Sequence, residues 1–127
     1  MLWNKSLETG IALIDTQHKE LFRQIDDLLD AGKGNRFGET LNFLEKYIVK
    51  HFTDEQKMHV TSKYPKAAKH KEYHDNYVTV FSKLKEKYAK EGPTLENRIA
   101  INKTVVGWLK SHILVHDREF AEYYKSL

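Results

Sequence analysis

The sequence of 127 residues contains no cysteine, and this absence excludes several kinds of site. Disulfides, zinc fingers, thiolate-bound iron–sulfur clusters and cysteine nucleophiles all require the thiol group. The chain also lacks an apolar run approaching the ~20 residues that cross a bilayer, and its start has no apolar stretch of signal-peptide length. We therefore expect a cytoplasmic protein that has no membrane partner.

Proline is scarce, and its two residues, Pro65 and Pro93, fall between stretches of helical apolar patterning rather than inside them. Within these stretches, apolar residues recur at steps of three and four. The sequence predicts an all-α protein formed by a single domain over residues 1–127. Its expected parts are an arm over about 1–14, helices over about 15–31, 38–62, 66–90 and 94–113, and a short carboxy-terminal helical segment over about 116–125.

Signals for helix ends support this division of the chain. Glycines at Gly32 and Gly34 suit the end of the first helix, and Thr94 is a good N-cap for the fourth. Long helices joined by short loops pack against antiparallel neighbours. The expected architecture is therefore an up-down-up-down antiparallel four-helix bundle.

The chain has only a small excess of positive charge, since it contains 21 basic and 18 acidic residues and its net charge is +3. The one local excess is residues 57–71, which contain lysines and no acidic residue. This stretch could contact an anionic partner or nucleic acid. No aromatic-interleaved basic groove or known recognition motif accompanies it, so we favour a solvated helix end and expect no nucleic-acid partner.

Histidine is abundant instead, with seven residues in the chain. Five of them fall on the apolar faces of the four predicted helices: His18, His51, His70, His74 and His112. Glu55 follows His51 by one turn and shares its face. A lone inward histidine is usually a core residue with hydrogen-bonded nitrogens. Burying five imidazoles and a carboxylate together is costly unless they satisfy one another, and a bound metal does this better than a purely structural polar layer.

The ligand types narrow the choice of metal. Imidazole and carboxylate without thiolate suit iron, zinc, copper or manganese, and the number of ligands exceeds what one tetrahedral zinc uses. We therefore expect two ions bridged by carboxylates. The Glu-x-x-His motifs of ferritin-like sites are absent, and His70 and His74 lack the glutamate of the His-Glu-x-x-His protease motif.

The whole chain resembles the hemerythrin family, in particular its free-standing bacterial members, the bacteriohemerythrins. Four groups of residues carry the resemblance: Asp15-Thr16-Gln17-His18, His51-Phe52-Thr53-Asp54-Glu55, His70-Lys71-Glu72-Tyr73-His74, and Trp108-Leu109-Lys110-Ser111-His112-Ile113 followed by Asp117. The resemblance implies two iron ions per chain with an oxo or hydroxo bridge. It assigns His70, His74 and His112 to one iron, His18 and His51 to the other, and Glu55 and Asp117 to both. Gln56 and Tyr77 depart from the family pattern, which often has glutamate and phenylalanine at these positions.

The resemblance also implies a function, which is reversible dioxygen binding at a non-haem di-iron centre for storage, delivery or sensing, and not enzymatic turnover. Dioxygen would bind as hydroperoxide at the two-histidine iron, in an apolar pocket of Phe52, Trp108, Leu109 and Ile113. The alternatives are a di-iron enzyme that reduces peroxide or nitric oxide, iron storage, and an interaction bundle with an incidental polar core. We expect a monomer, and a sensory role would require a separate redox or signalling partner.

Spacing and resemblance disagree after His112. On a regular α-helix, at ~100° per residue, His116 lies about 40° from His112 and Asp117 about 140° from it. Spacing thus favours His116 as a ligand, whereas the resemblance favours Asp117. A π-type turn across residues 113–116 would bring Asp117 back to the face of His112, and we predict this irregularity. His116 and His59 are then expected at the surface or beside the ligands.

Overall fold

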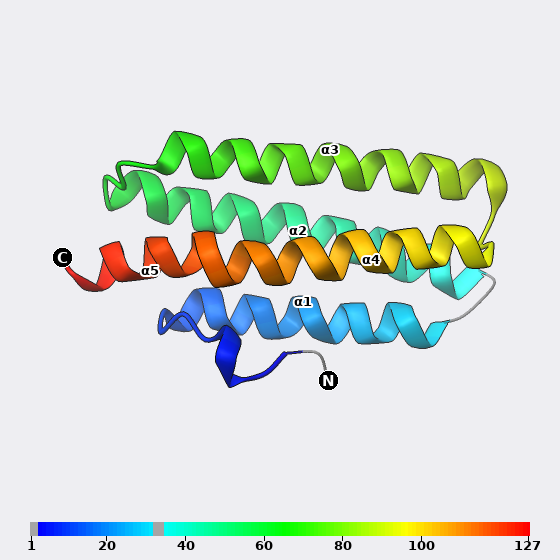
Figure 1. Ribbon diagram of the computed structural model, residues 1–127, viewed down its shortest axis with the longest axis horizontal. Helices are drawn as coiled ribbons and strands as arrows, with labels where there is room; N and C mark the ends of the chain where they lie inside the picture. Colours follow the sequence, from blue (N-terminus) through cyan, green and yellow to red (C-terminus); the bar gives the residue numbers. More distant parts are fainter. Residues whose placement is uncertain (1–2, 32–34) are drawn as a thin grey trace.

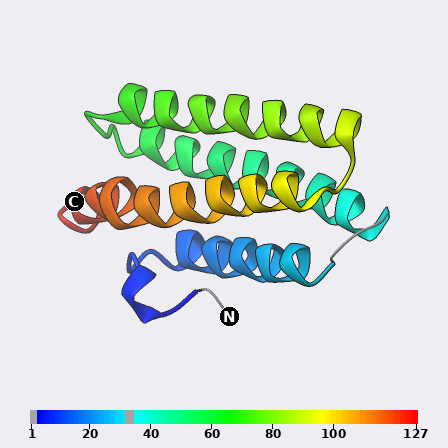
Figure 2. The ribbon, with the colours of Figure 1, turned by 45° about the vertical axis from the view of Figure 1, so that its right-hand side comes forward.

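The computed structural model describes residues 3–31 and 35–127, which form a bundle of four long antiparallel helices (Figure 1). These are α1 (Ala12–Ala31), α2 (Asn35–Thr61), α3 (Ala67–Glu91) and α4 (Leu95–His112). A short turn, η1 (Lys5–Leu7), precedes α1, and α4 continues through η2 (Ile113–Asp117) into α5 (Arg118–Lys125). The turned view shows the amino-terminal arm lying beside α1 (Figure 2). The predicted all-α four-helix bundle is confirmed.

Capping residues determine where the helices begin and end, and the sequence predicted only some of these positions. Thr94 caps α4 as predicted, because its side chain accepts a hydrogen bond from the backbone N–H of Asn97. Gly92 ends α3 with φ of 82°, a left-handed value that glycine adopts without strain. Helix α1 begins at Ala12, before the predicted start at residue 15, and α2 begins at Asn35 rather than at residue 38. The predicted helix end at Gly32 and Gly34 lies outside the described residues.

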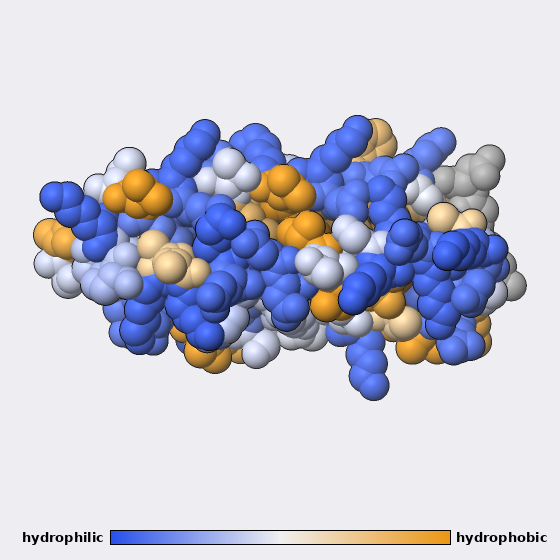
Figure 3. All heavy atoms as spheres, turned by 90° about the horizontal axis from the view of Figure 1, so that it is seen from above, coloured by the Kyte–Doolittle hydropathy of each residue, from blue (hydrophilic) through white to orange (hydrophobic). Residues whose placement is uncertain are grey.

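Two apolar clusters fill the bundle and lie on either side of a polar layer. The larger cluster includes Leu21, Ile48 and Leu109, and the smaller one, near α5, includes Ile14 and Phe120. Because each long helix contributes to the space between the clusters, polar side chains at that level converge from all four helices. The face shown in Figure 3 is mainly hydrophilic with scattered apolar patches, as expected of a solvated bundle. No helix among the described residues is long and apolar enough to cross a membrane.

The passage from α4 to α5 is a π-helical turn over Ile113–Asp117, so the predicted irregularity is confirmed and is one residue longer than expected. The backbone N–H of Arg118 donates to the carbonyl of Ile113, five residues earlier, which is the hydrogen bond of a π-turn. The wider turn places the side chain of Asp117 in the interior with no exposed surface. His116, at the regular helical spacing, is left half-buried.

Candidate metal centre

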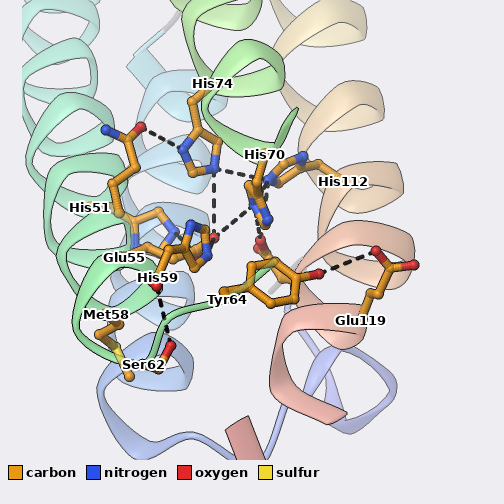
Figure 4. A network of polar contacts seen from close by, with 12 residues as sticks. His51, Glu55, Met58, His59, Ser62, Tyr64, His70, His74, His112 and Glu119 are labelled. Carbon is orange, nitrogen blue, oxygen red and sulfur yellow. Dashed lines mark hydrogen bonds and ion pairs between the residues drawn. The ribbon is translucent and has the colours of Figure 1, made fainter. Parts of the chain in front are cut away.

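Two groups of buried imidazoles and carboxylates meet in the polar layer of the bundle. Figure 4 shows Glu55 among His51, His70, His74 and His112 in this layer. One group consists of Glu55, His70, His74, His112 and Asp117, and the other of His18, His51, Glu55 and Asp117. Within each group every residue offers one ligand atom, and these atoms all lie within 4.8 Å of one another. The structure thus brings together the seven residues named from the sequence, each of them buried. Their assignment as metal ligands stays a prediction.

Helical spacing explains how this chain places seven polar groups at one level. His51 and Glu55 are one turn apart on α2, and His70 and His74 are one turn apart on α3, so each pair shares a face. Helices α1 and α4 each supply one histidine. The seventh group, Asp117, reaches the layer because the π-turn of η2 corrects its angular position.

The two carboxylates belong to both groups and divide their oxygens between them. Glu55 directs Oε1 toward His70 Nε2, at 2.8 Å, and Oε2 toward His51 Nε2, at 3.6 Å. Asp117 directs Oδ1 toward the Nε2 atoms of His70 and His112, at 3.1 Å each, and Oδ2 toward His18 Nε2, at 3.0 Å. Each carboxylate is therefore oriented to bridge two points, one inside each group.

Hydrogen bonds within the described residues satisfy only part of this polar layer. Both oxygens of Glu55 and Asp117, and both nitrogens of His18, are buried without a hydrogen-bond partner. The Nε2 atom of His112 lies 2.9 Å from that of His70 and 3.1 Å from that of His74. One imidazole, His70, faces both carboxylates and cannot satisfy all four of their oxygens, and buried polar atoms left without partners cost several kcal/mol each. The residues fit metal ions, because a cation at each point of convergence would satisfy these atoms together.

In each group, one histidine has its tautomer fixed by a glutamine. The Oε1 atom of Gln17 lies 2.8 Å from His51 Nδ1, and that of Gln56 lies 2.9 Å from His74 Nδ1. An amide oxygen can only accept, so Nδ1 carries the proton and Nε2 keeps its lone pair toward the centre. This is the form of imidazole that binds a metal. The amide nitrogen of Gln17 donates to Asp54 Oδ2 at 2.8 Å, which fixes the orientation of that amide.

Sequence reasoning missed this role for Gln17 and Gln56. The available signal was their position, because each glutamine directly precedes or follows a predicted ligand, His18 or Glu55. A glutamine beside a ligand on a helix points to a different side of that helix. Which neighbouring helix it then meets depends on how the helices pack, and helical periodicity does not specify this.

Burial and neighbouring charges give the metal-free layer the protonation states that metal binding requires. Burial lowers the pKa of His51 to about 4 and that of His74 to about 2, so both rings are neutral at pH 7. Burial and the charge of Asp117 oppose ionisation of Glu55, but the ring nitrogens of His59 and His70 that face its Oε1 atom outweigh them and lower its pKa to about 2. Neutral imidazole and ionised carboxylate are the forms that coordinate a metal.

His70 differs from the other histidines because it lies between the two carboxylates. Burial alone would lower its pKa, but the nearby carboxylates of Asp117 and Glu55 outweigh this effect and raise the pKa to about 9. In the metal-free protein His70 therefore carries a compensating positive charge at pH 7. A cation that took this place would release the proton.

Four apolar residues are predicted to line a pocket beside the two-histidine group: Phe52, Trp108, Leu109 and Ile113. Phe52 stacks on His74 at a centroid distance of 3.8 Å, and Trp108 stacks on His112 at 4.5 Å. Both rings thus lie against the three-histidine group, and the ring of Phe52 also lies 5.8 Å from that of His51 in the two-histidine group, so their role in a ligand pocket stays a prediction. Trp108 lies against His112 because it precedes this residue by one turn of α4 and shares its face. Leu109 and Ile113 are fully buried in the main core cluster, and their place in a ligand pocket stays a prediction.

The two histidines outside the groups have different surroundings. His116 stacks on Tyr73 at a centroid distance of 4.0 Å and keeps part of its surface exposed. His59 is 1% exposed, so the surface position considered for it is wrong. Its Nε2 lies 3.4 Å from Glu55 Oε1, which places it directly beside the centre.

Comparison with known proteins matches this geometry to a family. A family profile described as "Hemerythrin HHE cation binding domain" matches residues 9–124. The chain is 33% identical over 111 residues to a myohemerythrin from Theromyzon tessulatum, covering 87% of this chain and 82% of that protein. It is 33% identical over 117 residues to a bacteriohemerythrin from Methylococcus capsulatus, covering 89% and 88%. A crystal structure described as wild-type hemerythrin superimposes with a TM-score of 0.85 at 29% identity, covering 96% of this chain and 95% of that one.

Proposed function

Because the chain belongs to the hemerythrin family, we propose that it binds dioxygen reversibly at two iron ions held inside the four-helix bundle. The observation that carries the proposal is the pair of ligand groups that share two carboxylates whose oxygens are otherwise buried without partners. Family membership and this cluster support a non-haem iron protein that binds oxygen. The two-iron arrangement with an oxo or hydroxo bridge is the finer part of the proposal.

The proposed ligands divide unequally between the two ions. His70, His74 and His112 would hold one iron, His18 and His51 the other, and the carboxylates would give one oxygen to each. The two-histidine iron then has one protein ligand fewer and can accept a small exogenous ligand. Two ferrous ions at these positions would supply the electrons that dioxygen takes up reversibly when it binds.

The protein's own contribution is to hold the ligands ready and to keep water away. Gln17 and Gln56 keep the protons of His51 and His74 on Nδ1, so the ligand atoms do not have to be deprotonated first. Leu109 and Ile113 have no exposed surface and close the core around the layer. A buried site excludes the water that would compete for the open position and promote irreversible oxidation.

An enzymatic role is not part of the proposal. Hemerythrins are oxygen-binding proteins rather than enzymes, and the relatives described above carry hemerythrin names. Storage, delivery and sensing use the same binding step. A sensory role would need a separate signalling partner.

The test is to reconstitute the protein anaerobically with ferrous iron, admit air and then remove it while the visible spectrum is recorded. We expect about two irons per chain and an absorption band that appears with dioxygen and disappears on its removal over repeated cycles. Irreversible bleaching with turnover of added peroxide would favour the enzyme instead. A chain that retained no iron would contradict both functions.

A further inference from the structure

His59 is a buried histidine that the seven proposed ligands leave unexplained. Its side chain is 1% exposed, and neither ring nitrogen has a hydrogen-bond partner within residues 3–31 and 35–127. An imidazole buried in this way costs a few kcal/mol unless it meets a polar group. The polar atom that it faces is Oε1 of Glu55, one turn earlier on α2, at 3.4 Å from Nε2 (Figure 4).

The position of His59 makes the two bridging carboxylates unequal. Among the described residues, the oxygens of Asp117 contact proposed ligands alone, namely His18, His70 and His112. Glu55 also contacts proposed ligands, but it has His59 as an additional nitrogen neighbour. A carboxylate oxygen that binds a metal with one lone pair keeps a second lone pair free, and that lone pair can accept one hydrogen bond. His59 is placed to donate it.

We propose that His59 is a positioning residue, which donates a hydrogen bond from Nε2–H to Glu55 Oε1 and so orients this carboxylate between the two metal ions. The proposal rests on the metal binding put forward above and goes beyond it, because His59 lies outside both ligand groups. The ring is held in place by Phe120, in an edge-to-face contact at a centroid distance of 4.3 Å, and by Tyr64 at 5.3 Å. These two ring contacts hold the imidazole of His59 in one orientation, with Nε2 facing Glu55.

A direct role of His59 as an eighth ligand has less support from the geometry. Neither set of mutually close ligand atoms includes a nitrogen of His59. Its ring lies 4.4 Å from that of His70 and 6.4 Å from that of His74. A positioning role and a ligand role predict different tautomers. The positioning role requires the proton on Nε2, the opposite of His51 and His74.

The decisive measurement is made on the wild-type protein loaded with zinc, a metal without redox chemistry. Nitrogen-15 NMR of the histidine rings should show His59 protonated at Nε2 and bare at Nδ1, and His51 and His74 protonated at Nδ1. A metal-shifted or unprotonated Nε2 in His59 would overturn the positioning role. This measurement does not depend on whether a variant folds.

Variants test the energetic consequence. His59→Phe keeps a ring against Phe120 and Tyr64 but has no donor, whereas His59→Gln can place an N–H close to the Nε2 position. Loss of such an outer-shell hydrogen bond weakens metal binding by about 10- to 100-fold. We expect that loss of zinc affinity for His59→Phe and substantial recovery for His59→Gln. His116→Phe, at a histidine that reaches neither carboxylate, is the matched control and should bind zinc as the wild type does.

The outcomes separate this inference from the proposed function. If the wild type binds zinc and His59→Phe binds it equally well, with only its melting temperature changed, His59 is structural and the inference is wrong. If the wild type binds no zinc or iron, the proposed metal centre itself is wrong, and the inference fails with it. An antisymmetric carboxylate stretch that moves in His59→Phe and returns in His59→Gln supports a hydrogen bond to Glu55.

Discussion

Gln17 and Gln56 each fix the tautomer of a histidine, and we expect the loss of Gln17 to weaken metal binding more than the loss of Gln56. Gln17 is 5% exposed and its partner His51 is 1% exposed, so no solvent can replace the amide if Gln17 is changed to leucine. His74 is as buried as His51, at 1% exposed, but with Gln56 it lines an open groove of about 350 Å³ between α2 and α3. Water in this groove can accept the Nδ1–H of His74 in place of Gln56.

The expected size of the effect follows from the unpaired donor. Leaving the buried Nδ1–H of His51 without an acceptor costs about 1–3 kcal/mol, and the ring can avoid this cost only by moving its proton to Nε2, the ligand atom. Since 1.4 kcal/mol is tenfold in affinity, Gln17→Leu should weaken metal binding at the two-histidine group by about 5- to 150-fold. Gln56→Leu should weaken the three-histidine group by less than about tenfold, because a water-mediated bond is nearly as good as a direct one.

The assay is zinc titration against a competing chelator, which resolves the two sites if they differ in affinity. Gln24→Leu is the matched control, because Gln24 lies two turns after Gln17 on α1 and its amide contacts only Glu20, at 3.2 Å. Its zinc affinity should equal that of the wild type. The tautomer argument is refuted if Gln17→Leu binds zinc as tightly as Gln24→Leu, or if Gln56→Leu has the larger effect.

Two further predictions concern Asp117 and the pH dependence of stability. Asp117→Asn should weaken zinc binding at both groups by more than ~100-fold, which is the largest loss expected when only a hydrogen bond to a ligand is removed. His116→Phe should leave zinc binding unchanged. Equal zinc affinities of the two variants, measured by elemental analysis and titration, would refute Asp117 as a ligand. The metal-free protein should lose stability as the pH falls from 6.5 to about 4, because burial lowers the pKa of His51 to about 4 and the unfolded chain takes up the proton first. Between pH 6.5 and 9 the stability of the metal-free protein should instead fall as the pH rises, because the raised pKa of His70, about 9, gives stability that is lost when the ring loses its proton. The free energy of unfolding, measured by chemical denaturation from pH 4 to 9, should therefore pass through a maximum rather than a plateau.

The fold followed from the sequence because apolar periodicity is a local property that each helix carries along its own length. Local capping was harder to predict. The carboxylate of Asp15 accepts hydrogen bonds from the backbone N–H groups of Thr9 and Gly10, at 2.8 and 3.0 Å, and a carboxylate inside the helix thereby orders the residues before it. The predicted helix began at this residue, whereas the observed helix begins at Ala12.

The site was predictable to the extent that its residues share helix faces. The histidines and Glu55 could be grouped because each interrupts an apolar stripe. The parts that were missed or misplaced depend on contacts between helices. The stacking of Trp108 on Tyr77, the burial of His59 and the amide contact of Gln17 all arise from how neighbouring helices meet, which single-helix patterns do not contain.

The π-turn explains why regular helical spacing does not predict which residue after His112 enters the polar layer. A regular helix would have presented His116 to the layer, but a neutral imidazole has one inward lone pair and can serve one group only. A carboxylate has two oxygens, and Asp117 directs one toward His112 and the other toward His18. The layer already has three histidines on one side and two on the other, so the group that it lacks is a second bridge. The wider turn supplies this bridge and leaves His116 to stack on Tyr73 at the partly exposed edge.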